Sequence, residues 1–537
     1  MLVEGRPLPP YGIDLYAEHR LLTNGIECGN RLIDAANFWG VDCMESMYKD
    51  QWHKRFIETE PPFPQEWKEG ALDYNFEDVE VTTRLLEVMA SRIDLGHALI
   101  RGAYMLALAE IEHLGFPVDV PLYLWMQEHW DEIKQRMIDA CPYAVFEGLS
   151  FNHEKFERFL EEELGVTSWK RTPSGRLLLQ SRYFAQMAYE YPQLEGIHRI
   201  KRQLDTFDTF TLGIDVKDAR NRAAWWPFKS KTGRNQPKAL NVFSNHSRYV
   251  RGLGTPPPGR ALCELDYEQQ EFAIVAALSE DPRMIESYLS GDPYMALAVL
   301  AGAAPPDATK KTHKLVRDRY KVTALAVQFG STGAGIARRL GEPHAEGAIL
   351  LRQYDETYEV FREWQRLKRA NARYGEPMVL SHGWRLFGGE DIGWRTIDNF
   401  WAQGSGSEML RSAVVKIRQA GIDIVALVHD AIIIEAEVDD IEDAAATAAR
   451  IMGDVSEKIL LGRLRLRTEA KFVGPSDRLL CEEAMSMWNL VTGPYFAELS
   501  GNGIRPAARI PGRFSANLGS PQCEPQDVSV RTPFATG

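Results

Sequence analysis

Two acidic positions lie where the surrounding sequence otherwise predicts buried β-strands. Asp266 follows the apolar run ALCEL (261–265), and His429–Asp430 interrupts the β-branched segment 421–437. Burying an unpaired carboxylate costs on the order of several kcal/mol unless it is paired or bound to a metal. Two carboxylates at strand ends, far apart in the chain, are what a two-metal centre for phosphoryl transfer needs. For each aspartate alone, a turn or a helix cap is the ordinary alternative.

A basic segment at 310–321, KKTHKLVRDRYK, stands out in a chain whose formal net charge is −13. Arg317 and Lys321 are four residues apart, so they share one face of a helix, which Leu325 and Phe329 continue. Cations followed by apolar residues suit a triphosphate lying along the helix with a base stacked beyond it. A charge run is more often a solvated surface, and the four-residue spacing is what favours phosphate binding here.

The elements that must carry these residues follow from the spacing of the apolar side chains. Helical spacing predominates over 93–225 and again, with more basic residues, over 281–375, and one long helix is predicted for 395–420. The chain of 537 residues is too long for one compact core, so several domains are expected. After about residue 495 the sequence is rich in Gly, Pro and Ser without periodicity, which predicts a disordered tail.

The overall composition is that of a globular protein, 45% hydrophobic and 26% charged. No apolar run reaches the roughly 18 residues that span a bilayer, and the start lacks a signal-peptide pattern. The six cysteines show no zinc-binding spacing, which predicts free thiols in a reducing cytoplasm. Because phosphate binding needs local positive charge, the acidic total requires an acidic exterior around a basic cleft if the partner is a nucleic acid.

Short motifs around these residues resemble those of family A DNA polymerases, the DNA polymerase I type. Six matches occur in the family's order, and the sequence of residues 267–298 is similar to that of phage-encoded members. They are YNFED (74–78), TGR (232–234), LDYEQQE (265–271), RDRYKVTALAVQFG (317–330), RTIDNFWAQGSGSE (395–408) and LVHDA (427–431).

The resemblance implies a role for each matching residue. Asp266 and Asp430 would bind two Mg²⁺ ions, with Mn²⁺ able to substitute, and the Tyr267 carbonyl would be a backbone ligand. Glu271 would crowd the sugar 2′ position and exclude ribonucleotides. His429 would sit beside the primer end.

The same resemblance assigns the remaining site residues. Arg317 and Lys321 would hold the incoming dNTP, with Lys321 also donating a proton to the leaving pyrophosphate, and Phe329 would pack at the templating position. Primer–template DNA would be lined by four residues: Arg234, Arg395, Asn399 and Gln403. We expect a monomer without membrane contact, and leave open a processivity or replisome partner.

Three positions depart from the family's pattern. Ala431 stands where the third motif has Glu, Leu325 where an aromatic residue is usual, and Tyr294 where a His contacts phosphate. Asp266 and Asp430 alone must then provide the carboxylates. We expect these changes to tune rate or fidelity.

The front of the chain matches only the last motif of a proofreading exonuclease, at Tyr74 and Asp78, with no Asp-x-Glu before it. A two-metal nuclease needs more than one of its carboxylates, so we expect this chain alone not to proofread. A natural truncation, a misassigned start and an exonuclease on another chain all remain open. Ordinary helix-start chemistry is the alternative for Tyr74 and Asp78.

The fold that the resemblance implies is α+β and multidomain, a right hand of palm, fingers and thumb with an antiparallel palm sheet, preceded by a partial exonuclease-like α/β domain. The expected divisions are a partial exonuclease-like domain at 1–92, a helical thumb at 93–225, palm at 226–290, fingers at 291–377, palm again at 378–495, and a tail at 496–537.

Two other functions use the same residues. A catalytically inactive primer–template-binding subunit would keep the DNA-lining residues and would account for Ala431. A nuclease would use Asp266 and Asp430 but would leave the cationic helix without a task. Retention of both aspartates together with Arg317 and Lys321 favours the DNA polymerase.

Overall fold

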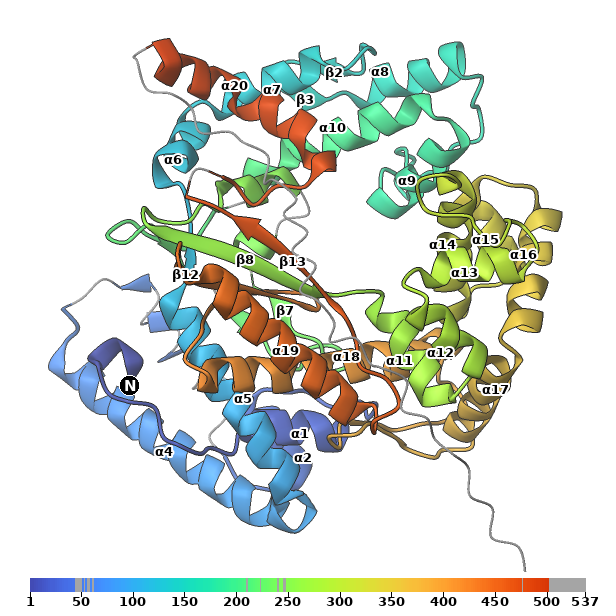
Figure 1. The fold of residues 1–537 in the computed structure, drawn as a ribbon. Helices are drawn as coiled ribbons and strands as arrows, with labels where there is room; N and C mark the ends of the chain where they lie inside the picture. The colour runs from blue at the N-terminus through green and yellow to red at the C-terminus, as the bar shows by residue number, and fades with distance from the viewer. Residues whose placement is uncertain are drawn as a thin grey trace, which may run out of the picture.

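A four-stranded antiparallel sheet lies at the centre of the molecule (Figure 1). Its strands, in the order β11-β12-β8-β13, are β11 (Asp423–Val428), β12 (Ala431–Glu437), β8 (Arg260–Tyr267) and β13 (Thr468–Val473). The structure, a computed structural model, describes residues 1–43, 51–52, 54–55, 58–59, 62–208, 211–222, 224–238, 241–244, 248–475 and 477–501. The strands predicted around Asp266 and Asp430 are therefore neighbours in one sheet.

Register brings the two aspartates to the same end of the sheet. Val428 pairs with Ala431, so His429 and Asp430 form the turn of the β11–β12 hairpin. On the next strand pair, Ile432 lies opposite Leu265, the residue before Asp266. The hairpin turn and the end of β8 are thus adjacent.

Helices cover both faces of this sheet, which explains why β8, β11 and β12 are largely apolar, whereas the edge strand β13 alternates polar and apolar residues. Helix α19 (Ile441–Ile459) packs on β8, β12 and β13, whereas α5 (Leu95–Leu114) and α18 (Trp394–Gln419) contact β11. Successive residues of β12, from Ile432 to Ile434, are fully buried as a result. Alternation of polar and apolar residues indicates a strand with one face in solvent, and residues 431–434 of β12 do not alternate.

A group of helices lies above the sheet in Figure 1. It comprises α6 (Val120–Glu128), α7 (Trp130–Asp139), α8 (His153–Arg158), α9 (Ser181–Glu190), α10 (Gln193–Asp208) and α20 (Met485–Gly501). Helix α20 packs on α6 and α7, and its Trp488 and Val491 are buried. It runs to Gly501, past residue 495 where we expected structureless sequence, because this apolar face anchors it. Residues 502–537 lie outside the described residues.

A second helical group lies to the right of the sheet (Figure 1). It comprises α11 (Gln270–Ser279), α12 (Pro282–Leu289), α13 (Pro293–Leu300), α14 (Lys314–Gln328), α15 (Gly333–Leu340), α16 (His344–Thr357) and α17 (Glu359–Arg373). Long helix α18 runs from this group to the sheet. Its mid-helix glycines have a packing reason, since a Cβ at Gly406 would lie 2.5 Å from Gln270 Oε1 of α11.

The described part of residues 1–92 is helical. It contains α1 (Leu15–Thr23), α2 (Leu32–Trp39), α4 (Gln65–Met89) and the short η1 (Leu2–Glu4) and η2 (Ala90–Arg92). The α/β character that we expected for this segment is not seen in the residues described there. In the same described set, no helix is both long enough and apolar enough to cross a bilayer.

Short elements complete the chain. A small sheet in the order β1-β5-β4 contains β1 (Phe116–Pro117), β4 (Ile214–Asp215) and β5 (Arg220–Asn221). Two-stranded pairs join β2 (Phe146–Glu147) to β3 (Ser150–Phe151), β6 (Trp225–Trp226) to β7 (Gln236–Pro237), and β9 (Met378–Val379) to β10 (Arg385–Leu386). The remaining short helical turns are η3 (Phe159–Glu163), η4 (Val242–Ser244), η5 (Arg248–Leu253) and η6 (Glu482–Ala484).

The close crossing of α15 and α16 depends on Gly347. A Cβ at this position would lie 2.1 Å from the Gly333 carbonyl oxygen, which is backbone and cannot rotate away. We predict that Gly347→Ala lowers the free energy of unfolding by about 1–3 kcal/mol, the usual cost of overpacking. Chemical denaturation monitored by circular dichroism measures it.

Gly196 on α10 is the matched control, because a Cβ there meets nothing within 4 Å. Gly196→Ala should stabilise by up to about 1 kcal/mol, since glycine is a poor helix former. Equal effects of the two substitutions would contradict the packing explanation.

Candidate active site

The two aspartates lie near each other at one end of the sheet, close enough for the charge of Asp430 to act on Asp266. The pKa of the Asp266 carboxyl is raised to about 7, first by burial and then by the negative charge of Asp430. Asp266 Oδ1 is buried and makes no hydrogen bond in the described structure. His429 holds the hairpin turn in the left-handed region, at φ 57°. A buried carboxylate oxygen without a hydrogen bond, close to a second carboxylate, fits a divalent cation, because Mg²⁺ prefers oxygen ligands.

Other potential ligands around these aspartates are few. Within the described ranges, no three or more His, Cys, Asp or Glu side chains are grouped so that they could hold a metal ion. The Tyr267 side chain is turned into the core, where its hydroxyl donates to the Met452 carbonyl at 2.9 Å. Tyr267 could therefore serve a metal only through its backbone, as the resemblance implied.

Glu271 connects the aspartates to two of the predicted DNA-lining residues. Its Oε1 lies 3.4 Å from Arg234 Nη2 and 3.4 Å from Gln403 Nε2. Burial raises the pKa of Glu271, the Arg234 charge lowers it, and the nearby Asp430 charge raises it again. Four segments thus meet here: the loop before β7, α11, α18 and the β11–β12 turn.

The cationic helix α14 reaches this site through an aromatic ring. Arg317 Cζ lies 5.4 Å and Lys321 Nζ 5.9 Å from the centroid of the Tyr294 ring. Burial raises the pKa of the Tyr294 hydroxyl, and the Glu271 charge raises it further. Tyr294 therefore stands between the cations of α14 and the carboxylate of Glu271. The shared face expected for Arg317 and Lys321 is confirmed.

Asp292 is a contributor that sequence reasoning missed. Its side chain accepts from Met295 N at 3.2 Å, which caps α13, and from Arg317 Nε at 2.5 Å. Arg317 is consequently buried, whereas Lys321 is exposed. The Asp-Pro pair at 292–293 signals a helix start, but nothing in the sequence reveals the second partner of this carboxylate, 25 residues away.

The far end of α14 adjoins the start of α18. Leu325 and Phe329 are half-buried below Lys321, and the next residue, Gly330, has φ +72°. A Cβ at Gly330 would lie 3.7 Å from Arg395 Cγ. Arg395 begins a four-residue spacing along α18 that Asn399 and Gln403 continue, and Asn399 Oδ1 is buried without a hydrogen bond in the described residues.

Tyr74 and Asp78 are not brought to this site. Both lie on α4, which contacts α1 and α2 and is on the opposite side of the molecule from α14 (Figure 1). Their assignment to an exonuclease remnant stays a prediction.

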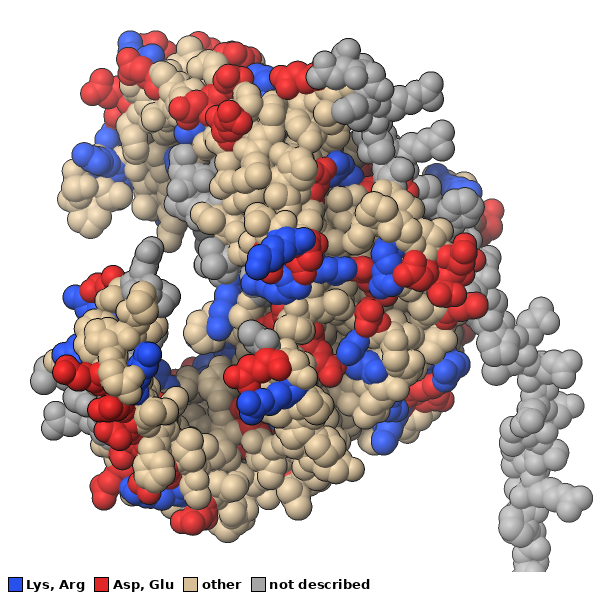
Figure 2. All heavy atoms as spheres, turned by 90° about the vertical axis from the view of Figure 1, so that its left-hand side faces the viewer, with Lys and Arg blue, Asp and Glu red and all other residues tan. Residues whose placement is uncertain are grey.

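Charge on the surface is mixed on the side viewed in Figure 2, where Lys and Arg lie among Asp and Glu. A deep recess is visible at the left of that view between an upper and a lower part of the molecule. The acidic total of the chain is therefore not spread as one uniform acidic surface on this side.

The central sheet with two helical groups beside it, and with carboxylates at adjoining strand ends, defines a hand-shaped polymerase fold. A solved structure supports this: the POL domain of Pol1 from M. smegmatis, in complex with DNA primer-template and dNTP, matches with a TM-score of 0.60. The two are 21% identical, and the match covers 82% of this chain and 80% of that one.

The chain belongs to DNA polymerase family A, whose sequence profile matches residues 126–472. DNA polymerase I of Rhizobium leguminosarum is 22% identical over 434 residues, covering 75% of this chain and 42% of that protein. The Aquifex aeolicus DNA polymerase I is 25% identical over 414 residues, covering 73% and 70%. The Mycobacterium phage L5 DNA polymerase is 23% identical over 362 residues, covering 66% and 58%. The chain thus spans less than half of the Rhizobium protein.

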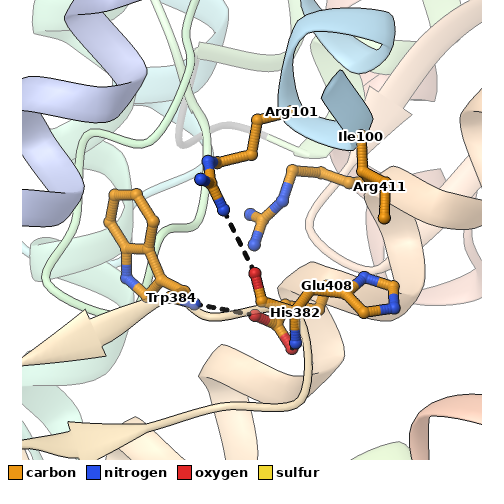
Figure 3. Close-up of a pocket in the computed structure, with 6 residues that line it drawn as sticks. All are labelled: Ile100, Arg101, His382, Trp384, Glu408 and Arg411. Atoms are coloured by element: carbon orange, nitrogen blue, oxygen red, sulfur yellow. Dashed lines mark hydrogen bonds between the residues drawn. The ribbon is translucent and has the colours of Figure 1, made fainter. Parts of the chain in front are cut away.

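A pocket is lined by Ile100 and by five charged or aromatic residues, Arg101, His382, Trp384, Glu408 and Arg411 (Figure 3). Buried Glu408 accepts from the backbone nitrogens of His382 at 2.9 Å and Trp384 at 3.2 Å. Burial lowers the pKa of the His382 imidazole to about 4, and the charges of His97 and Arg411 lower it too.

The lowered pKa of His382 predicts that the free energy of unfolding decreases in acid. Its folded-state pKa lies below its unfolded value of 6.5, so its contribution is complete above pH 6.5 and is lost as pH falls toward 4. The full shift corresponds to about 3 kcal/mol, which partial exposure of the ring reduces to about 1–2 kcal/mol. We predict a flatter acid limb for His382→Gln than for the wild type in unfolding curves measured between pH 4 and 7.

The Gln side chain leaves the contact from His382 N to Glu408 in place. The variant removes the titrating imidazole together with its 3.2 Å hydrogen bond to Ser412 Oγ. His344, at the exposed start of α16, provides the control: His344→Gln should retain the wild-type pH dependence. Parallel curves for the wild type and His382→Gln would refute the prediction.

Proposed function

We propose that this chain is a template-directed DNA polymerase, extending a primer 3′ end with dNTPs by a two-metal phosphoryl transfer. One observation carries the proposal: the Asp266–Asp430 pair and the Arg317–Lys321 pair, distant in sequence, are linked through Glu271 and Tyr294. The M. smegmatis relative in complex with DNA primer-template and dNTP supports the choice of substrates. The bacterial and phage relatives support a cytoplasmic location.

Asp266 and Asp430 would hold Mg²⁺, or Mn²⁺ in its place, which lowers the pKa of the primer 3′-hydroxyl and screens the triphosphate charge. Burial and the nearby Asp430 charge leave the ionised Asp266 carboxylate poorly stabilised without a cation. His429, in the same turn, lies beside the primer end. Ala431 next to it contributes no carboxylate, so the two aspartates carry this part of the site.

Arg317 and Lys321 bind the triphosphate of the incoming nucleotide. Asp292 holds Arg317 Nε and so orients the guanidinium before substrate arrives. Exposed Lys321 is the proton donor to the leaving pyrophosphate, since an ammonium on a flexible stem can follow the departing oxygen. Arg317 is thus held in place, whereas Lys321 can move. This division of roles suits a reaction that depends on positioning and charge neutralisation.

Glu271 excludes ribonucleotides by occupying the space next to the sugar 2′ position. Its contacts with Arg234 and Gln403 keep the side chain in that place. Arg234, Gln403, Asn399 and Arg395 then line the duplex at the primer terminus, and Phe329 packs at the templating position with Leu325 below the base.

We also propose that this chain by itself does not proofread. Its sequence carries Tyr74 and Asp78 of the exonuclease motif without an Asp-x-Glu ahead of them. A nuclease that works through two metals cannot run on one carboxylate.

Primer extension on a primed template with Mg²⁺ and four dNTPs tests the main proposal. Asp430→Ala should lower the extension rate by on the order of 10³-fold, because charge stabilisation at the reacting phosphate is lost. Asp439→Ala, which removes an exposed carboxylate just beyond β12, should leave the rate unchanged. A lane without dNTPs reports 3′ degradation, expected to be nil.

Tight binding of the wild type to primed template without any extension would refute the proposed polymerase activity and favour a catalytically inactive DNA-binding subunit. Release of mononucleotides would instead favour a nuclease.

Two substitutions of Glu271 distinguish the effect of its side-chain volume on sugar discrimination from the effect of its charge. We predict that Glu271→Ala narrows the dNTP-to-NTP ratio of kcat/KM by about tenfold or more, because room opens for a 2′-hydroxyl. Glu271→Gln has nearly the same volume and should keep most of the discrimination. Single-nucleotide incorporation of dCTP and CTP opposite a template G measures both. Equal ratios in the two variants would rule out a steric role.

A further inference from the structure

The loop that carries Arg234, residues 227–234, is held by an element outside the polymerase motifs. This segment, the Arg234 loop, lies between β6 and β7 and has an unusual backbone: Phe228 has φ 53° and Gly233 has φ +73°. Its internal hydrogen bonds centre on Ser230 and lie in the second half of the loop, among them Gly233 N to Ser230 O at 2.9 Å and Arg234 N to Ser230 Oγ at 2.9 Å. A loop of this kind needs external support to hold one conformation.

Helix α1 supplies that support from one face. Tyr16 and Arg20 are four residues apart and project from the same side of α1, and Asn24, the residue that caps the C-terminal end of α1, continues this line. All three donate to backbone carbonyls of the Arg234 loop, in chain order. The bonds run from Tyr16 Oη to Pro227 O (3.3 Å), from Arg20 Nε to Phe228 O (3.2 Å) and Nη2 to Lys229 O (2.9 Å), and from Asn24 Nδ2 to Lys231 O (2.7 Å).

The helix is itself fixed by a buried ion pair. Glu18 of α1 accepts from Arg101 of α5 at 2.6 and 2.8 Å, and both side chains are at most 5% exposed. Arg101 also donates to the His382 carbonyl at 3.1 Å, a bond drawn in Figure 3. A buried pair that lost one partner would leave an uncompensated charge, so this anchor resists displacement.

The opposite side of the Arg234 loop rests on α18 and on the segment before it. Buried Arg411 donates to the Gly233 carbonyl at 2.8 Å, and its guanidinium lies 4.8 Å from the centroid of the Phe228 ring. Trp384 Nε1 donates to the Lys231 carbonyl at 3.0 Å, the same carbonyl that Asn24 binds. The loop is thus clamped between α1 and α18, and Arg234 emerges from the clamp toward Glu271.

We propose that α1 is a positioning element of the polymerase site: Tyr16, Arg20 and Asn24 set the Arg234 loop so that Arg234 meets Glu271 and the primer terminus. The inference rests on the proposed function, because it gives residues of the exonuclease-like segment a part in synthesis. Geometry at a reacting centre is sensitive to displacements of about 1 Å, so a loosened loop affects turnover.

The test compares the full chain with the double variant Arg20→Ala/Asn24→Ala. We expect kcat/KM for dNTP incorporation to fall by about tenfold. In an Arg234→Ala background the same two substitutions should cause no further loss, because the residue through which they act is gone. A merely destabilised fold would lower the rate in both backgrounds.

Hydrogen exchange gives a readout that does not depend on activity. The amides of Gly233 and Arg234 should exchange faster in the double variant, whereas those of β8 should be unchanged. Arg31→Ala, which removes an exposed arginine paired with Asp34 in the same N-terminal segment, is the matched control and should alter neither exchange nor kinetics.

Two results would overturn the inference: an equal loss of kcat/KM in the Arg234→Ala background, or faster loop exchange with unchanged kinetics. A wild-type chain that does not extend primers would overturn the proposed function, and with it the catalytic part of this inference. The exchange data would still report separately whether α1 holds the loop.

Discussion

Electrostatic repulsion between Asp266 and Asp430 is the constraint around which the site is built. The same sheet handles another buried carboxylate differently. Glu435 on β12 is neutralised by Arg220, whose two guanidinium nitrogens each lie 2.8 Å from a carboxylate oxygen, and by Arg260 at 3.0 Å. No cation of the protein is paired in this way with Asp266 in the described structure, where one carboxylate oxygen is left without a hydrogen bond. The fold can therefore pair a buried carboxylate with arginines, and it leaves the buried Asp266 oxygen without such a partner.

The structure suggests a physical role for each of the three residues that depart from the family's motifs, Tyr294, Leu325 and Ala431. Tyr294 lies beneath both cations of α14, and an aromatic face attracts cations without competing for the phosphate as an anion would. Leu325 adds apolar surface on the same helix but no ring. Ala431 is buried next to the hairpin turn, where a longer acidic side chain would have increased the repulsion already present.

Sequence reasoning found the residues whose spacing is set within one element, and failed where contacts join distant segments. The four-residue spacing of Arg317 and Lys321 implied a shared helix face, and the apolar flanks of Asp266 and Asp430 implied strands. Asp292 and α1 could not be found in this way, since their partners are 25 or more than 200 residues away. In residues 1–92, the resemblance of YNFED (74–78) to an exonuclease motif led us to expect an α/β domain. The described part of this segment is helical.

The attachment of α1 to the Arg234 loop is made to carbonyl oxygens, which every residue possesses. Side chains of that loop can therefore drift through substitution while the attachment persists, and the helix can be retained without leaving a covarying pair in related sequences. The profile of the family, which begins at residue 126, does not include α1. Comparative searches based on residue identity would overlook such a bond, and it becomes visible only when main-chain acceptors are traced in three dimensions.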